Sequence, residues 1–188
     1  GNLISSIVTL VATFNNQILG NDEISQFFNS NACIGGAFLI SSFWTTIFTE
    51  KKKWTFVIAS MLLVSASFLS LCGAIVSKWC IYSHWWGVLN GIVMSFFSGW
   101  LTVAAAIAVG TTTNVYNHGI DSSVNNKLGW SPFPIVISIL LSIISIFSAN
   151  PVLLIPFLIS TAFIKDFSKC HIYVSFIVSI VGVLISTL

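Results

Sequence analysis

Charged residues are scarce in this sequence. Only 6% of its 188 residues are charged, none is arginine, and 56% are hydrophobic, with a mean hydropathy of +0.97. A soluble domain carries about 25% charged residues, because its surface must be solvated. Seven lysines and five acidic residues cannot cover a soluble protein of 20.4 kDa. The composition therefore excludes a water-exposed monomer, a nucleic-acid binder and a disordered chain, and it indicates an integral membrane protein.

Ionisable side chains are missing from the middle of every apolar segment. Such side chains mark proton relays, pumps and ion pathways, so their absence argues against a primary pump, a proton-coupled transporter and a voltage sensor. A facilitator for apolar solutes stays open. No Ser-His-Asp order or Gly-rich phosphate loop has supporting context, and the pair Asp22-Glu23 is better explained as a solvated loop. We therefore expect no enzymatic activity and no catalytic residues.

Cysteine and histidine are also few, and they lie far apart. The four cysteines form no C-x-x-C metal or redox motif, and Cys33 and Cys72 sit in apolar runs, where cysteine acts as a small apolar residue. His84, at a segment end, has the side chain to bind a haem or chlorophyll axially, but an interfacial histidine without a ligand explains it more simply. We predict no metal site.

Long apolar runs are what the sequence has in abundance. At about 20 residues per membrane-spanning helix, the chain has room for at most about seven spans. The runs are continuous rather than alternating, which disfavours a β-barrel. We predict an all-α polytopic transmembrane helix bundle that forms one membrane domain over residues 1–188. The predicted spans are about 3–19 (the weakest), 32–48, 54–76, 85–111, 133–147, 152–164 and 172–188.

The lysines lie between these segments and are unevenly distributed. Six lie in the loops 49–53, 112–131 and 165–171, which seven spans would place on one side of the membrane, and Lys78 alone lies on the other. The positive-inside rule then places the N-terminus on the cytoplasmic, matrix or stromal side and the C-terminus opposite. An organelle inner membrane, such as that of a mitochondrion, fits this scheme.

Three consecutive lysines and several stripes of small residues have alternative interpretations. The run Lys51, Lys52 and Lys53 either anchors the topology or binds anionic lipid headgroups, to which each Lys contributes about 1 kcal/mol near such a surface. Small residues inside the spans favour close helix approach. Serines on the fifth span can bond to their own helix carbonyls or to a neighbouring helix. The small-residue positions are Gly35-Gly36-Ala37, Ser65-Ala66-Ser67, Ala104 to Ala108, Ser138, Ser142 and Ser145.

A family resemblance begins at Phe97, where the sequence continues Ser98-Gly99-Trp100-Leu101-Thr102-Val103-Ala104-Ala105. This run resembles the Gly-Trp-aliphatic-Thr-Val-Ala motif in the fourth span of TspO/MBR-related, tryptophan-rich sensory membrane proteins. Asn150-Pro151-Val152, which opens a span, looks like a later part of longer members. The chain lacks the family's Pro-Pro-x-Trp and Trp-x-x-x-Tyr signatures. The resemblance implies a TspO-like five-helix core that binds tetrapyrroles, sterols or other lipophilic ligands.

Trp100 is the first candidate binding residue, because tryptophan is unusual at mid-span. Five of the seven tryptophans lie at span ends, where amphipathic rings settle at the headgroup level. Trp100 either packs against a neighbouring helix or lines a ligand pocket. The candidate ligand-binding residues are Trp100, Gly99, Phe97, Phe96 and Trp44.

Two non-enzymatic functions follow from the sequence. The first is a structural or accessory subunit of a larger membrane complex of respiratory or photosynthetic type, with other membrane-protein subunits and the lipid bilayer as partners. The second is a TspO-like binding or transport module for a tetrapyrrole, a sterol or a lipid. Gly1 and the four residues after it also match the N-myristoylation pattern, although removal of an initiator Met explains a leading glycine more simply.

Overall fold

The computed structural model describes residues 21–50, 52–77, 85–118, 133–163 and 169–187. These residues form α-helices joined to one short 3-10 helix, without a β-strand among them, so the predicted all-α class is confirmed for the described part of the chain. The helices are α2 (Asn21–Phe48), α3 (Lys53–Ser77), α4 (Trp85–His118), α5 (Phe133–Ser148), the 3-10 helix η4 (Pro151–Leu154), α6 (Ile155–Phe163) and α7 (Lys169–Ser186).

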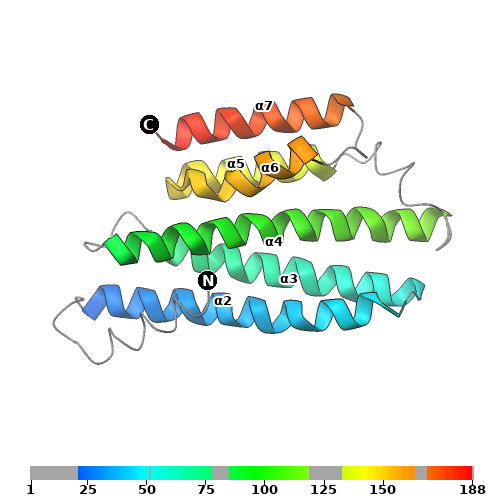
Figure 1. The fold of residues 1–188 in the computed structure, drawn as a ribbon, viewed down its shortest axis with the longest axis horizontal. Coiled ribbons are helices and arrows are strands. Elements are labelled where there is room, and N and C mark those ends of the chain that lie inside the picture. Colours follow the sequence, from blue (N-terminus) through cyan, green and yellow to red (C-terminus); the bar gives the residue numbers. More distant parts are fainter. Residues whose placement is uncertain (1–20, 51, 78–84, 119–132, 164–168, 188) are drawn as a thin grey trace.

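Helix α4 lies between two groups of helices (Figure 1). On one side, α2 packs on α3 and α3 packs on α4, with successive helices running in opposite directions. On the other side, α5 packs on α7, and η4 and α6 join this pair to α4. The ends of α2 and α4 and the starts of α3, α5 and α7 lie at one end of the molecule (Figure 1).

The packing places small side chains inside and large apolar side chains outside. On α3 the buried positions recur every three or four residues and include Ala59, Ala66, Ser70 and Gly73, so they form one stripe along the helix. Large side chains on the other face, such as Phe68 at 69% exposure, project outward. Because lipid tails are as apolar as leucine, membrane helices associate through small residues and hydroxyl groups. This arrangement is compatible with an integral membrane protein.

Hydroxyl groups connect α3 to α4 at successive levels. The Ser67 and Thr102 hydroxyls lie 2.8 Å apart, and Ser98 donates to the Ser70 carbonyl at 2.8 Å. Nearer the other end of α4, Ser60 donates to the Ala108 carbonyl at 3.0 Å. Hydrogen bonds between membrane helices contribute about 0.6 kcal/mol each on average, so these contacts fix the register of α3 against α4 more than they determine stability.

A tight turn after α5 sends the chain back across α4. Ala149 adopts a left-handed conformation with φ of 47°, and its N–H donates to the Ile146 carbonyl at 3.1 Å. The Asn150 N–H donates to the Ser145 carbonyl at 2.9 Å, which completes a Schellman-type helix end. The buried Asn150 amide then donates to the Ser95 hydroxyl of α4 at 2.7 Å, tying this turn to the central helix.

The helix boundaries agree closely with some predicted spans and differ for others. The spans 54–76 and 133–147 match α3 and α5 to within one residue at each end. The expected loop 112–131 is wrong in its first part, because α4 continues to His118. Hydroxyl groups of Thr112 and Thr113 bond to main-chain carbonyls, so polar side chains do not stop this helix. The span 152–164 divides into η4 and α6, and the span 3–19 lies outside the described residues.

Three of the described helices are long and apolar enough to cross a membrane. They contain the stretches Asn29–Phe48, Lys53–Ser77 and Gly87–Tyr116. Three shorter apolar helical stretches cover Ile135–Ser148, Pro151–Thr161 and Tyr173–Ser186. The described helices therefore fit a membrane protein, while the count of about seven spans stays a prediction.

Candidate functional site

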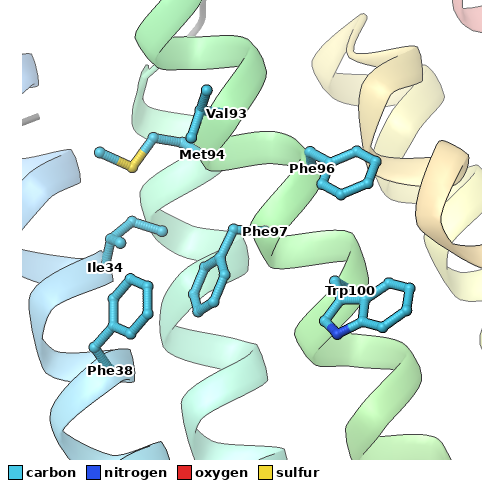
Figure 2. A pocket seen from close by; sticks show the side chains of 7 residues that line it. All are labelled: Ile34, Phe38, Val93, Met94, Phe96, Phe97 and Trp100. Carbon is cyan, nitrogen blue, oxygen red and sulfur yellow. The ribbon is translucent and has the colours of Figure 1, made fainter. Parts of the chain in front are cut away.

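An apolar groove lies between α2 and α4, with α3 behind it (Figure 2). Its volume is about 360 Å³, in the size range of small-molecule sites. We call it the α2–α4 groove. Its lining residues are Ile34, Phe38, Val93, Met94, Phe96, Phe97 and Trp100.

Helical spacing explains how these side chains come to share a groove. Ile34 and Phe38 are one turn apart on α2, while Val93, Phe97 and Trp100 follow one another on one side of α4. The Phe38 and Phe97 rings stack across the two helices with centroids 4.2 Å apart and planes at 16°. This stack connects the α2 and α4 walls of the groove and forms part of its apolar surface.

The residues that line the groove differ in burial. Ile34 and Met94 are nearly inaccessible, with 2% and 3% exposure, while Phe96 and Trp100 are 39% and 50% exposed. The groove therefore has a packed interior and an aromatic edge that is open to the surroundings of the protein. From Val93 to Trp100, α4 rises about 10 Å, so the groove occupies the part of α4 between its start and its middle.

The structure brings together three of the five residues proposed from the sequence. Trp100, Phe97 and Phe96 all line the groove, and Figure 2 shows their side chains along one stretch of α4. Phe96 and Trp100 extend on the side nearer the α5 and α6 ribbons, whereas Phe97 turns toward Phe38 (Figure 2). Trp100 is half exposed, which fits pocket lining better than burial against a helix.

Gly99 and Trp44 take other roles in the structure. A Cβ atom on Gly99 would overlap the Leu153 carbonyl oxygen, so this glycine allows η4 to approach α4 closely. Trp44 packs beside the buried cluster around Leu63 and Leu101, with its ring 5.3 Å from that of Phe48. Neither residue lines the α2–α4 groove, since each contacts a different part of the bundle.

Sequence reasoning missed four lining residues, namely Ile34, Phe38, Val93 and Met94. Ile34 and Phe38 have the spacing of one helix face, and so do Val93 and Phe97. That spacing predicts which residues share a face. It does not predict that these two faces meet, because this depends on how α2 and α4 pack on α3.

Among the residues that the structure describes, the lining offers no charged or titratable side chain. The metal-ligating atom among these residues is the Met94 sulfur, and they supply no cation for the carboxylate groups of a tetrapyrrole. His84 lies outside the described residues, which contain no cluster of three potential metal ligands. The chemistry of the lining therefore fits a neutral apolar molecule better than a tetrapyrrole.

The lysine run lies at the turn from α2 to α3, outside this groove. Lys52 pairs with Glu50 at 3.3 Å, and its ammonium lies 5.8 Å from the centre of the Trp54 ring. Lys53 is exposed at the start of α3. Lys51 lies outside the described residues.

Comparisons with protein-family models, with curated proteins and with solved structures found no match to this chain. The resemblance to TspO/MBR-related proteins therefore stays a prediction from residues 98–105.

Proposed function

We propose that this protein is a non-enzymatic integral membrane protein that binds a neutral lipophilic molecule, such as a sterol or a lipid acyl chain, in the α2–α4 groove. The observation that carries the proposal is the aromatic and aliphatic lining around about 360 Å³, in which none of the described residues is charged. An apolar molecule already dissolved in the bilayer gains no free energy from leaving water when it binds, so its affinity comes from close contact with these rings. The stacked Phe38 and Phe97 and the exposed Trp100 supply that contact.

A crosslinking experiment tests this proposal directly. Photoreactive cholesterol and photoreactive palmitoyl phosphatidylcholine are incorporated separately into vesicles that hold the purified protein, and labelled peptides are mapped by mass spectrometry. We expect label between residues 93 and 100. Trp100→Ala should reduce it about two- to tenfold, the range of one aromatic contact of about 0.5–1.5 kcal/mol.

Trp85→Ala is the matched control, because Trp85 is also an exposed tryptophan on α4 and lies outside the groove. Its labelling should equal that of the unaltered protein. Label spread evenly over other exposed apolar side chains, such as Phe147 at 89% exposure, would instead identify ordinary bilayer contact and contradict the proposal. An absorbance spectrum with a tetrapyrrole band would contradict the preference for a neutral ligand.

A second candidate function is that of an accessory subunit in a larger membrane complex. Helix α5 has 16 residues and rises about 24 Å, less than the roughly 30 Å of a bilayer core. Short spans are accommodated by a thinned bilayer or by neighbouring proteins, and this favours partners beside α5 and α7. Mild-detergent native electrophoresis tests it: migration with a large complex supports the accessory function, and migration as a free 20.4 kDa protein contradicts it.

A further inference from the structure

A second groove lies between α3 and α4 and shares no lining residue with the first. Its volume is about 410 Å³, and we call it the α3–α4 groove. Nothing in the proposed function assigns a role to it. Its lining residues are Val57, Ser60, Met61, Val64, Ser65, Val109, Thr112 and Thr113.

The α3 wall of this groove is continuous with the lysine run. Lys53, Val57, Met61 and Val64 follow at intervals of one turn, so they lie along the same side of α3. Val57 is about 6 Å and Val64 about 16 Å along the helix from Lys53. A molecule lying in the groove therefore has an apolar wall along its length and an ammonium group near one end.

Three of the four hydroxyl groups in the groove, those of Ser60, Thr112 and Thr113, bond within the protein. Thr112 donates to the Phe56 carbonyl at 2.9 Å, and Thr113 donates to the Val109 carbonyl at 2.9 Å. Ser60 donates to the Ala108 carbonyl at 3.0 Å. With these donors occupied, the walls offer a ligand mainly hydrocarbon contact from valine, methionine and threonine methyl groups. A lipid chain fits such walls better than a ligand that needs hydrogen bonds.

The start of α3 has the features of a headgroup level. Trp54 is 55% exposed, and the Lys52 ammonium lies over its ring. Exposed tryptophan and lysine together mark the membrane–water interface. Glu50 neutralises part of the charge through its pair with Lys52, whereas Lys53 has no ion pair with any residue that the structure describes. Lys53 therefore leaves a positive charge at the mouth of the groove.

We propose that the α3–α4 groove and the lysines at its mouth form a binding site for one anionic membrane phospholipid. The phosphate group lies beside Lys53 and Lys52, and one acyl chain lies along Val57, Met61 and Val64. Charge and length decide for this occupant, because the apolar wall begins one turn below the ammonium groups and continues for about 10 Å. The site is independent of the ligand proposed for the α2–α4 groove.

Native mass spectrometry of the full chain in detergent micelles measures this site. Phosphatidylglycerol and phosphatidylcholine are titrated separately, and the dissociation constant of the first lipid adduct is determined for each. We expect tighter binding of phosphatidylglycerol. Each unpaired lysine contributes about 1 kcal/mol, or about fivefold, and the pair with Glu50 reduces the contribution of Lys52. The double variant Lys52→Gln, Lys53→Gln should therefore weaken phosphatidylglycerol binding about five- to 25-fold and leave phosphatidylcholine binding within about twofold.

Two matched controls separate the site from general effects. Lys169→Gln removes the same charge at the start of α7 and should leave phosphatidylglycerol affinity unchanged. Val109→Phe places a larger side chain in the groove and should weaken both lipids, whereas Ile107→Phe, on α4 outside the groove lining, should weaken neither. Retained phosphatidylcholine binding and helical circular dichroism show that the lysine variant is folded.

Three results would overturn the proposal. Equal affinity of the unaltered protein for the two lipids would contradict recognition of the anionic headgroup. An equal loss of phosphatidylglycerol affinity in Lys169→Gln and in the double lysine variant would show unspecific electrostatic attraction. Equal lipid affinities of Val109→Phe and Ile107→Phe would contradict binding in the α3–α4 groove. Glycerol 3-phosphate is added as a competitor, and displacement of the lipid by this soluble phosphate would assign the lysines to a free anion instead.

Discussion

Gly99 shows how one residue sets the distance between α4 and the helices that follow it. A Cβ atom there would overlap the Leu153 carbonyl oxygen and lie 3.1 Å from the Pro156 side chain. Both neighbours are constrained, one as main chain and the other as a proline ring, so neither has a flexible side chain that could move away. A Cβ atom on Gly35 of α2 would lie in open space, with no neighbouring atom within 4 Å.

These two glycines provide a matched prediction. Gly99→Ala should reduce the free energy of unfolding by about 1–3 kcal/mol, the usual cost of overpacking. Gly35→Ala should raise it by up to about 1 kcal/mol, because alanine is the better helix former. Reversible unfolding in mixed detergent micelles measures both changes. Equal effects of the two substitutions would contradict the close approach of η4 to α4.

The residues of the α2–α4 groove were only partly predictable. Trp100 stood out because it is a mid-span tryptophan, and its neighbours Phe96 and Phe97 were found with it. Gly99 adjoins Trp100 in the sequence, but consecutive residues on an α-helix point about 100° apart. Gly99 therefore meets Leu153 on another side of α4. Phe38 was missed, since its contact with Phe97 depends on how two helices pack.

At the scale of elements, α5 and α7 meet through small residues. We call this contact the α5–α7 seam. From the sequence, the serines of α5 can bond either to carbonyls of their own helix or to a neighbouring helix. The structure contains both, because Ser138 donates to its own helix and Ser142 donates to the Val178 carbonyl of α7. Gly182 of α7 lies against Ser142. The buried small residues of the two helices are Ser138, Ser142, Ser145, Ser175, Ser179, Gly182 and Ser186.

Ser179 gives the prediction for this seam. Its buried hydroxyl has no hydrogen-bond partner among the described residues, so Ser179→Ala should leave stability unchanged or raise it by up to about 1 kcal/mol. Ser179→Leu should lower stability by about 1–3 kcal/mol, because the larger side chain forces the helices apart. Unfolding of the two variants in micelles measures the difference. A destabilised alanine variant would show that Ser179 makes a hydrogen bond after all.

Helix ends were less predictable than helix interiors. Apolar runs located α3 and α5 closely because hydropathy changes sharply at their boundaries. In α4, the polar residues 111–114 looked like the start of a loop, but Thr111 and Asn114 are buried. Thr112 donates to the Phe56 carbonyl of α3, so the tertiary structure accommodates polar side chains in this part of α4, which a hydropathy pattern cannot reveal.

At the scale of the molecule, the helix ends next to the lysine-bearing loops lie together. The turn from α2 to α3, the end of α4 and the start of α7 are all at one end of the bundle, and the end of α7 is at the other (Figure 1). This arrangement agrees with the sorting of lysines made from the sequence.

The positive-inside rule gives a testable orientation. Thr49 is exposed at the turn from α2 to α3. In a background without the native cysteines, a membrane-impermeant maleimide is added to the side opposite the cytoplasm, matrix or stroma. Thr49→Cys should react with it only after the membrane is permeabilised. A cysteine added after Leu188 should react before permeabilisation. The reverse pattern would contradict the predicted orientation.

The sequence by itself predicts a lipid environment and an all-α class, and the structure confirms the class for the residues that it describes. With so few charges and such long apolar runs, the chain can satisfy its main-chain hydrogen bonds in a bilayer only by forming helices. The tertiary structure decided where grooves exist and which residues line them. The physical reason is that hydropathy describes the transfer of single residues into lipid. The α2–α4 and α3–α4 grooves depend instead on which faces of these helices meet.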